Sequence, residues 1–551
     1  MQYEEAVSKG QSFLLFRILL KTKGDQWSPF APQRLTCGMS LHSKVVFKDY
    51  TPKQMILLPP SLEELIESNH PVFTVNEVID RIDIGSLKLS YKGGGTSSYH
   101  PRMLLKVLIY AYLSNIYSSR KIESALNENI HFMWLSGMSR VDHNTINRFR
   151  GDRLKGSLKQ IFSQVVLLLA EEGHVNIKSI YTDGTKIEAN ANRYTFVWGR
   201  AIAKSKQRME DQLEAIWRYT QKVAKAEIQD TEDVNFDQID KEKLQAAITR
   251  IDQALKDKPV DKKVKQKINY IKKNWSDKLD EYEKKLQILG NRNSYSKTDK
   301  DATFMRIKED HMQNGQLKPA YNWQFSTSDQ FIINYSIHQQ TTDTNTFIPH
   351  LLEYENLYQS MPDEVTADSG YGSQENYEFL EDNQIDGYVK YNYFHKEQQQ
   401  EKKNKVPDPF NSKNFYYDKE QDRYYCPMGQ PMHNIGQSER KTASGFVQKS
   451  IKYQAINCRG CPLRCLCNRS QNNRIIEVNH KLNQLKQRAR ERLTSQKGLD
   501  HRSKRPWDVE AVFGMIKQNK NYRRSMLRGV EKVEIEAGLL AIAHNMAKMV
   551  A

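Results

Sequence analysis

The sequence lacks any long, uninterrupted apolar run. A membrane-spanning helix needs about 18 or more such residues in succession, and no segment approaches that length. The apolar stretch at residues 12–20 is much shorter and contains Arg17. Lys21 and Lys23 follow it, where a signal peptide would carry small residues and a cleavage site. These absences predict a cytoplasmic chain with neither a membrane span nor a secretory signal.

Cysteine is also scarce, and no glycine-rich phosphate-binding loop of the Walker type is present. The chain has six cysteines, and four of them lie between Cys458 and Cys467. In a reducing compartment, such a cluster favours metal binding over disulfide bonding. The missing phosphate loop predicts a protein that does not use ATP.

Acidic side chains are outnumbered by basic ones. Asp and Glu total 66 in 551 residues, against 83 for Lys and Arg, which gives a formal net charge of +17. The isoelectric point near 9.2 suits a polyanionic partner, either nucleic acid or an anionic membrane surface. The length predicts roughly two to four domains.

Residues 1–38 show no clear periodicity, whereas the sequence that follows Met39 looks like the conventional beginning of a protein. The first segment is therefore either a leader upstream of the true start or a disordered basic tail. Residues 39–160 have a helical pattern with recognisable helix starts, at Pro101 in a first turn and at Asp142 as a cap. The last helix of this region is basic and carries Arg148, Arg150, Arg153 and Lys155.

Three short helices with a basic last one resemble a helix-turn-helix unit. The alternative is a plain helical subdomain with a solvated basic face. The charge of the whole chain favours a DNA-binding domain at residues 39–160.

Strands and helices alternate at residues 161–203 and 300–396, which predicts an α/β core in two parts. Residues 177–182 form a predicted strand before Asp183, and residues 364–367 form one before Asp368. Residues 480–551 are basic and helical and complete this core.

Two insertions interrupt the predicted core. At residues 204–299, apolar positions recur at spacings of three and four, which is typical of a helical hairpin or coiled coil with a solvated charged face. A coiled coil would offer a dimerisation surface. Residues 397–479 are polar and contain the cysteine cluster.

Three acidic residues occupy positions that a metal-dependent phosphodiester reaction would need. Asp183 and Asp368 each follow a predicted strand, and Glu510 lies on a predicted helix with an apolar face. Carboxylates that converge from separate elements can hold two Mg²⁺ or Mn²⁺ ions roughly 3.5–4 Å apart.

Each of these acids also has an ordinary explanation. Asp183 with Gly184 could form a hairpin turn, Asp368 could cap a helix, and Glu510 could be a solvated helix residue. Asp508 competes with Glu510 for the catalytic role.

The cysteine cluster predicts a structural zinc site, which would fold an insertion too polar to form a core of its own. Cys458 and Cys461 form a CxxC pair, and Cys426 and Cys467 complete four thiolate ligands. Cys465 is a rival to Cys467, His433 is a weaker one, and reduced thiols without metal are the alternative.

Several segments resemble bacterial DDE-type insertion-sequence transposases, whose RNase H-like catalytic core carries an insertion before its last acid. They occur in order from about Val45 to Met549, so the resemblance covers nearly the whole chain after the first segment. The matching segments are VVFKDYTPKQMILLPPSLEELI, YHPRMLLKVLIYAYL, YTDGTKIEANANRYTFVWG, PAYNWQFSTSDQFII, TADSGYGSQENYEFLE, CRGCPLRCLC and VEAVFGMIKQNKNYRRSMLRGVEKVEIEAGLLAIAHNM.

The resemblance implies that Asp183, Asp368 and Glu510 are the DDE triad. Lys517 matches the lysine of the family's tyrosine-arginine-glutamate-lysine signature, which holds a DNA phosphate near the end being cut. The arginine expected four residues before the glutamate is replaced by Pro506, with Arg505 or Lys504 as its substitute, and the tyrosine position is unmatched.

Further DNA contacts are expected from Arg523 and Arg524, beside that signature, and from Arg148 and Arg150. The resemblance also selects Cys467 as the fourth zinc ligand, because CPLRCLC matches the family's Cys-Pro-x-Arg-x-x-Cys pattern.

The implied fold is an RNase H-like mixed sheet with a helical N-terminal DNA-binding domain, a coiled-coil insertion and a small Cys-rich insertion. The implied reaction is attack of metal-activated water at the transposon end, followed by attack of the freed 3′-hydroxyl on target DNA. Expected partners are terminal inverted repeats, target DNA and a second copy of the chain in a nucleoid-associated synaptic complex. The alternatives are a DNA-binding relative that does not cut and a metal nuclease without strand transfer.

Overall fold

The computed structural model describes residues 61–91, 98–224, 236, 239–307, 315–403 and 406–550. The predicted leader at residues 1–38 and the start at Met39 lie outside these ranges. None of the described helices is long and apolar enough to cross a membrane.

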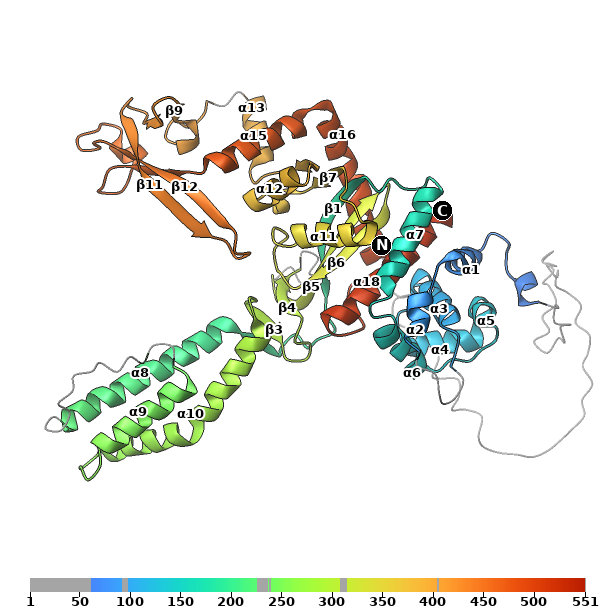
Figure 1. Ribbon diagram of the computed structural model, residues 1–551, viewed down its shortest axis with the longest axis horizontal. Helices are drawn as coiled ribbons and strands as arrows, with labels where there is room; N and C mark the ends of the chain where they lie inside the picture. The colour runs from blue at the N-terminus through green and yellow to red at the C-terminus, as the bar shows by residue number, and fades with distance from the viewer. Residues whose placement is uncertain are drawn as a thin grey trace, which may run out of the picture. The chain divides into compact units, whose positions relative to one another are not determined.

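A mixed six-stranded sheet forms the centre of the fold (Figure 1). Its strands lie in the order β4-β5-β1-β7-β8, and β6 pairs with β5 off this path. β1 is antiparallel to β5 and parallel to β7, so the sheet combines both kinds of pairing. The mixed α/β architecture is consistent with the predicted RNase H-like core. The strands span Ser179–Glu188 (β1), Thr303–Arg306 (β4), Leu317–Ser328 (β5), Phe331–His338 (β6), Glu364–Ala367 (β7) and Asp386–Val389 (β8).

Helices cover the sheet and share its hydrophobic core. α18 (Val530–Val550) packs on β6, where the Asn545 side chain accepts from the backbone N of Ile332 and donates to its carbonyl, both at 2.8 Å. α7 (Leu158–Glu171) and α11 (Phe347–Tyr358) also contact β6, and α12 (Gln374–Asp382) packs on β8.

His544 is buried between α18 and the β5–β6 turn, where its Nε2 lies 2.9 Å from the carbonyl of Gln330 and donates to it. Burial lowers the pKa of His544 from 6.5 to about 4, which means that the folded state holds the neutral ring. Its contribution to stability is present above pH 6.5 and is lost as the pH falls toward 4. We expect the free energy of unfolding, measured in denaturant, to fall by about 3 kcal/mol between pH 6.5 and pH 4 through this group. The fall should be smaller in His544→Gln. Identical pH profiles for both proteins would contradict the assignment.

The N-terminal helices contribute to the same hydrophobic core as the sheet. Pro101 begins α3 as predicted, and Asp142 caps α6 by accepting from the backbone N of Asn144 at 2.9 Å and of Thr145 at 3.0 Å. α3 packs along α18, so this region is not a separately cored unit. Its elements are Leu62–Leu65 (η1), Pro71–Arg81 (α1), Gly85–Leu89 (α2), Pro101–Leu113 (α3), Ser119–Glu128 (α4), Ile130–Ser136 (α5), His143–Arg148 (α6) and the π-helical Phe149–Arg153 (η2).

A helical hairpin or coiled coil was predicted for the first insertion. Its described residues form three helices: α8 (Gly199–Val223), α9 (Lys241–Ala254) and α10 (Lys262–Leu289) (Figure 1). They pack around an apolar core of their own, which includes Leu213 and Trp275 from the predicted apolar stripes. Because these stripes are buried within the chain, they are not free to pair with a second copy.

The insertion leaves and rejoins the rest of the chain at one place. β2 (Phe196–Trp198) pairs with β3 (Ser294–Ser296), and the backbone N of Gly199 donates to the carbonyl of Asn293 at 3.0 Å. This pairing closes the base of the three-helix bundle.

The second insertion contains a five-stranded antiparallel sheet in the order β13-β12-β11-β10-β9. It has a small apolar core that includes Tyr424, Met432 and Tyr453, so the expectation of an insertion too polar for its own core was wrong. Its elements, with α13 before them, are Phe394–Lys402 (α13), Ser412–Asn414 (η4), Tyr416–Asp418 (β9), Arg423–Tyr425 (β10), Pro431–Lys441 (β11), Val447–Ala455 (β12), Arg464–Cys467 (α14) and Ile475–Val478 (β13).

The basic C-terminal helices are anchored to the core by ion pairs. Arg488 on α15 (His480–Thr494) lies 2.8 Å from Glu381 on α12. Lys497 on α16 (Gln496–Arg505) pairs with Glu364 on β7. The remaining elements are the π-helical Pro506–Glu510 (η5), Ala511–Gly514 (α17) and the π-helical Met515–Asn519 (η6).

Candidate active site

Two of the predicted catalytic acids lie next to each other on neighbouring parallel strands. Thr182 on β1 is in register with Ala367 on β7, so the following residues, Asp183 and Asp368, meet at the same edge. β1 continues to Glu188, which means that Asp183 is inside a strand and not in a hairpin turn. Asp368 precedes a short 3-10 turn, Ser369–Tyr371 (η3), but its side chain makes no capping hydrogen bond.

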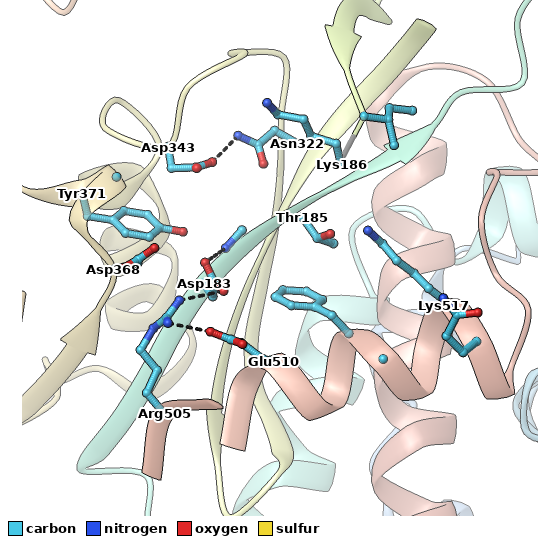
Figure 2. A pocket seen from close by; sticks show the side chains of 16 residues that line it. Asp183, Thr185, Lys186, Asn322, Asp343, Asp368, Tyr371, Arg505, Glu510 and Lys517 are labelled. Atoms are coloured by element: carbon cyan, nitrogen blue, oxygen red, sulfur yellow. Dashed lines mark hydrogen bonds and ion pairs between the residues drawn. The ribbon is translucent and has the colours of Figure 1, made fainter. Parts of the chain in front are cut away.

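Glu510 faces the same space from the C-terminal helices (Figure 2). One cavity of about 440 Å³ is lined by all three acids, together with Arg505 and Lys517. The structure therefore brings together the three carboxylates that the sequence placed on separate elements.

A π-helical turn brings Arg505, one of the two predicted substitutes for the arginine missing at Pro506, next to Glu510. In a π-helix, residues five apart bond and come to the same face, as residues four apart do in an α-helix. Pro506 begins η5, and Arg505 Nη1 lies 2.8 Å from Glu510 Oε1, five residues later. Its Nη2 lies 2.8 Å from Asp183 Oδ2, so Arg505 bridges two of the acids (Figure 2). The alternative substitute, Lys504, is exposed and does not line the cavity.

Asp508, the rival to Glu510, points elsewhere. It is buried, and its Oδ1 accepts from Thr327 Oγ1 at 2.6 Å and from the backbone N of Gln330 at 3.1 Å. These contacts fasten η5 to the turn between β5 and β6, which leaves Glu510 as the acid on this helix that faces the cavity.

The electrostatics of the cavity favour a bound cation. Burial raises the pKa of Asp183 to about 6, Arg505 opposes the shift, and Asp368 and Asp343 add to it. Lys390 Nζ lies 3.8 Å from Asp368 Oδ1, and burial lowers the pKa of Lys390. A carboxyl group whose pKa is raised by burial and by neighbouring acids is stabilised in its charged form by a nearby positive charge.

A fourth carboxylate lines the cavity and was missed by the sequence reasoning. Asp343 follows β6 in a loop with no regular pattern, and its Oδ1 accepts from Asn322 Nδ2 at 2.7 Å and Gln324 Nε2 at 3.3 Å. Gln324 also accepts from the Tyr371 hydroxyl, which ties the loop after Asp368 to β5. Asn322 and Gln324 alternate with the aromatic residues Tyr321, Trp323 and Phe325 on β5, and this spacing was the one available signal.

The predicted DNA contacts fall into two groups. Lys517 lines the cavity, and Arg523 lies beside it, with its Nε donating to the Lys517 carbonyl at 3.2 Å. Arg524 and Arg148 are exposed on the surface. Lys517 is buried in the cavity wall, whereas the three arginines are exposed, and contact with DNA stays a prediction for all four.

The prediction that Arg150 contacts DNA is wrong. Its side chain is buried and donates to the Tyr112 hydroxyl at 3.3 Å and the Tyr117 carbonyl at 2.7 Å. It also lies 4.0 Å from Glu536, which is fully buried. Arg150 therefore balances an internal charge and cannot reach a phosphate.

The four predicted zinc ligands line a second, smaller cavity of about 20 Å³, which can hold one water or ion. Cys426, Cys458, Cys461 and Cys467 belong to its lining, whereas Cys465 is exposed and does not. Cys467 Sγ accepts from Arg474 Nη1 at 2.8 Å, the kind of outer contact that metal-bound sulfur receives.

Neither cavity has metal-ligand geometry as it stands. Among the residues that the structure describes, no group of three or more His, Cys, Asp or Glu side chains is drawn close enough to hold an ion. The chemistry of the donors nevertheless fits: carboxylate oxygens suit Mg²⁺ or Mn²⁺, and four thiols suit Zn²⁺.

Two transposase family models match the chain. The model described as a transposase DDE domain covers residues 425–550 and includes Glu510. The model described as a transposase domain (DUF772) covers residues 60–152. Asp183 and Asp368 lie between the two matched segments, and no curated protein matches the sequence. Both matches are to transposase domains, and together they support a DNA transposase of the DDE-type insertion-sequence group.

Proposed function

We propose that the protein cuts DNA at the ends of its mobile element and joins the freed 3′ ends to target DNA. The observation that carries this proposal is the convergence of Asp183, Asp368 and Glu510 on one cavity from two adjacent strands and a facing helix. The three carboxylates would hold two Mg²⁺ or Mn²⁺ ions. When bound, the ions activate the attacking oxygen and stabilise the leaving oxygen of the phosphodiester.

Two displacements at phosphorus make up the proposed reaction. In the first, a water oxygen bonds to phosphorus, the bond to the 3′ oxygen breaks, and that oxygen leaves as a hydroxyl. In the second, this hydroxyl oxygen bonds to a target phosphorus, and the target's own 3′ oxygen leaves. The number of phosphodiester bonds is unchanged by the second step, so no ATP is needed.

The residues of the chain supply charge and position, not a covalent nucleophile. Lys186 and Lys517 line the cavity, where their ammonium groups can hold the phosphate being attacked. Arg505 forms an ion pair with both Asp183 and Glu510 and offsets part of their negative charge. Two DNA ends must be joined in concert, so we propose a homodimer as the working unit.

The proposed function is tested with purified protein and DNA that carries the element's ends, identified as inverted repeats flanking the reading frame. We expect strand breaks and joined products with Mg²⁺, and neither product with a chelator. Binding without any cutting would support a non-catalytic relative instead. Cutting without joining would support a metal nuclease that lacks strand transfer.

We also propose that the thiols of Cys426, Cys458, Cys461 and Cys467 bind one structural Zn²⁺ ion. Their shared cavity and the N–H···S contacts from Arg474 support this proposal. The ion would cross-link three parts of the insertion: the turn after β10, the segment after β12, and α14.

Metal analysis of the Cys458→Ser variant is expected to show loss of about one zinc per chain, together with a lower melting temperature. Cys465→Ser is the matched control, because this exposed cysteine is outside the cavity and its loss should retain the metal. Wild-type protein that contains no zinc and has freely alkylated cysteines would refute the site.

A further inference from the structure

A ledge of paired backbone extends from the rim of the carboxylate cavity. We define the ledge as residues 188–196 together with residues 523–528. The backbone N of Glu188 donates to the carbonyl of Arg523 at 3.2 Å, and the backbone N of Ser525 donates to the carbonyl of Glu188 at 2.9 Å. Asn190 Nδ2 donates to the carbonyl of Met526 at 2.6 Å, which extends the pairing along both segments.

Two arginines of the ledge are held in place by backbone carbonyls. Arg524 donates from Nε to Ala189 at 3.2 Å and from Nη2 to Ala191 at 3.1 Å. Arg528 donates from Nε to Asn190 at 2.8 Å. Both side chains are exposed, and a guanidinium has five N–H donors, so each keeps donors for a phosphate.

The ledge is continuous with the cavity. Arg523, at its near end, donates to the carbonyl of Lys517 at 3.2 Å and to the side chain of Gln518 at 2.7 Å. Lys517 and Gln518 both line the cavity. A DNA strand that leaves the carboxylates along this side would meet these arginines next.

The acidic side chains Glu188 and Asp299, which lie near the ledge, already have ion-pair or hydrogen-bond partners. Glu188 is buried and paired with Arg193 at 3.0 Å. Asp299 is buried and accepts from the Tyr321 hydroxyl at 2.9 Å and from the backbone N of Gly529. The charge that the ledge presents to solvent is therefore mainly positive.

Two aromatic rings lie exposed at the far end of the ledge. Tyr194 is 77% exposed and Phe196 is 47% exposed. The backbone N of Tyr194 donates to Asn192 Oδ1 at 2.9 Å, and the Phe196 ring packs edge-on against Phe304 with centroids 5.8 Å apart. Exposed rings beside fixed positive charges suit an unpaired nucleic-acid strand, whose bases stack while its phosphates meet the charges.

We propose that the ledge binds an unpaired DNA strand that continues from the cavity, with its bases stacked on Tyr194 and Phe196 and its phosphates on Arg524 and Arg528. This proposal rests on the proposed function, because it takes DNA as the substrate. A duplex keeps its bases stacked on one another, so the rings discriminate in favour of frayed or single-stranded DNA beside the cut.

The test is fluorescence anisotropy in a chelator, with a short duplex that is either blunt or carries a thymidine tail. Wild-type protein is expected to bind the tailed duplex more tightly than the blunt one. Tyr194→Ala should lose about ten-fold or more of the tail-dependent affinity and leave blunt-duplex affinity unchanged. Tyr194→Phe keeps the ring and should retain the wild-type affinity.

Tyr416→Ala is the matched control, because Tyr416 is 70% exposed on β9 of the second sheet. Removing the bases from the tail should weaken wild-type binding at least as much as Tyr194→Ala does, because it also removes the stacking on Phe196. Tyr194→Ala should add no further loss once the bases are removed, because its stacking contact is then already absent.

Equal binding of tailed DNA by Tyr194→Ala and Tyr416→Ala would overturn the ledge proposal, as would full affinity for the tail without bases. These measurements need no cleavage and no metal. If the wild-type protein binds the tail through Tyr194 but never cuts DNA, the proposal for the ledge is supported and the proposed function is refuted.

Discussion

Asp183→Asn, Asp368→Asn and Glu510→Gln are each expected to reduce Mg²⁺-dependent DNA cleavage by about a thousand-fold or more. Each substitution keeps the size of the side chain and removes one negative charge from a shared cavity. A carboxylate that holds a catalytic cation contributes several kcal/mol of transition-state stabilisation, and each 1.4 kcal/mol corresponds to about ten-fold in rate. The measurement is the rate of strand breakage on DNA with the element's ends.

Asp500→Asn is the control for the triad variants. Asp500 is an exposed acid on α16, near Glu510 in sequence but outside the cavity. Its loss should leave cleavage unchanged and stability within about 0.5 kcal/mol. A triad variant that cleaves as well as Asp500→Asn would remove that residue from the catalytic set.

Arg150→Met is expected to destabilise the protein by about 3–5 kcal/mol. The guanidinium of Arg150 is the buried positive charge opposite Glu536, which also accepts from the Tyr112 hydroxyl at 3.1 Å and from the backbone N of Met526 at 2.9 Å. Burial raises the pKa of Glu536, and Arg150 opposes that shift. Removing the arginine leaves a buried carboxylate that must either remain unpaired or take up a proton.

Arg148→Met provides the matched comparison, because Arg148 is exposed two residues earlier in the chain. We expect little change in its free energy of unfolding in urea, within about 0.5 kcal/mol. Adding Glu536→Gln to Arg150→Met should recover part of the lost stability, since no unpaired charge then remains. If the two arginine variants were equally stable, Arg150 would have no structural role.

The sequence pattern predicted the local structure around the first two acids well. The pattern located the strands β1 and β7, although β1 continues through Asp183 to Glu188 instead of ending before it. The pairing itself joins residues nearly two hundred positions apart, and only the folded sheet shows it. Likewise, the loop that carries Asp343 has no periodicity, so its approach to the cavity could not be read from the sequence.

Helical periodicity was less informative about the C-terminal acid and the basic helices. Counting residues from Glu510 in α-helical steps finds Pro506, whereas the π-helical turn brings Arg505 to the same carboxylate. Arg148 and Arg150 are equally basic in sequence. Arg148 ends α6 and is exposed, whereas Arg150 lies in η2 and its side chain is directed toward Glu536. Charge alone could not distinguish a surface contact from a buried counter-ion.

The closed base of the three-helix bundle makes the bundle replaceable as one unit. The hydrogen bond between Gly199 and Asn293 places the two ends of the bundle together, and the helices have a separate apolar core. A short turn can therefore replace the whole unit without stretching the sheet that holds Asp183, because ends already in contact need little chain to connect them. Insertion or deletion of the whole bundle at this point would therefore leave the pairing of β1 with β7, and the positions of Asp183 and Asp368, unchanged.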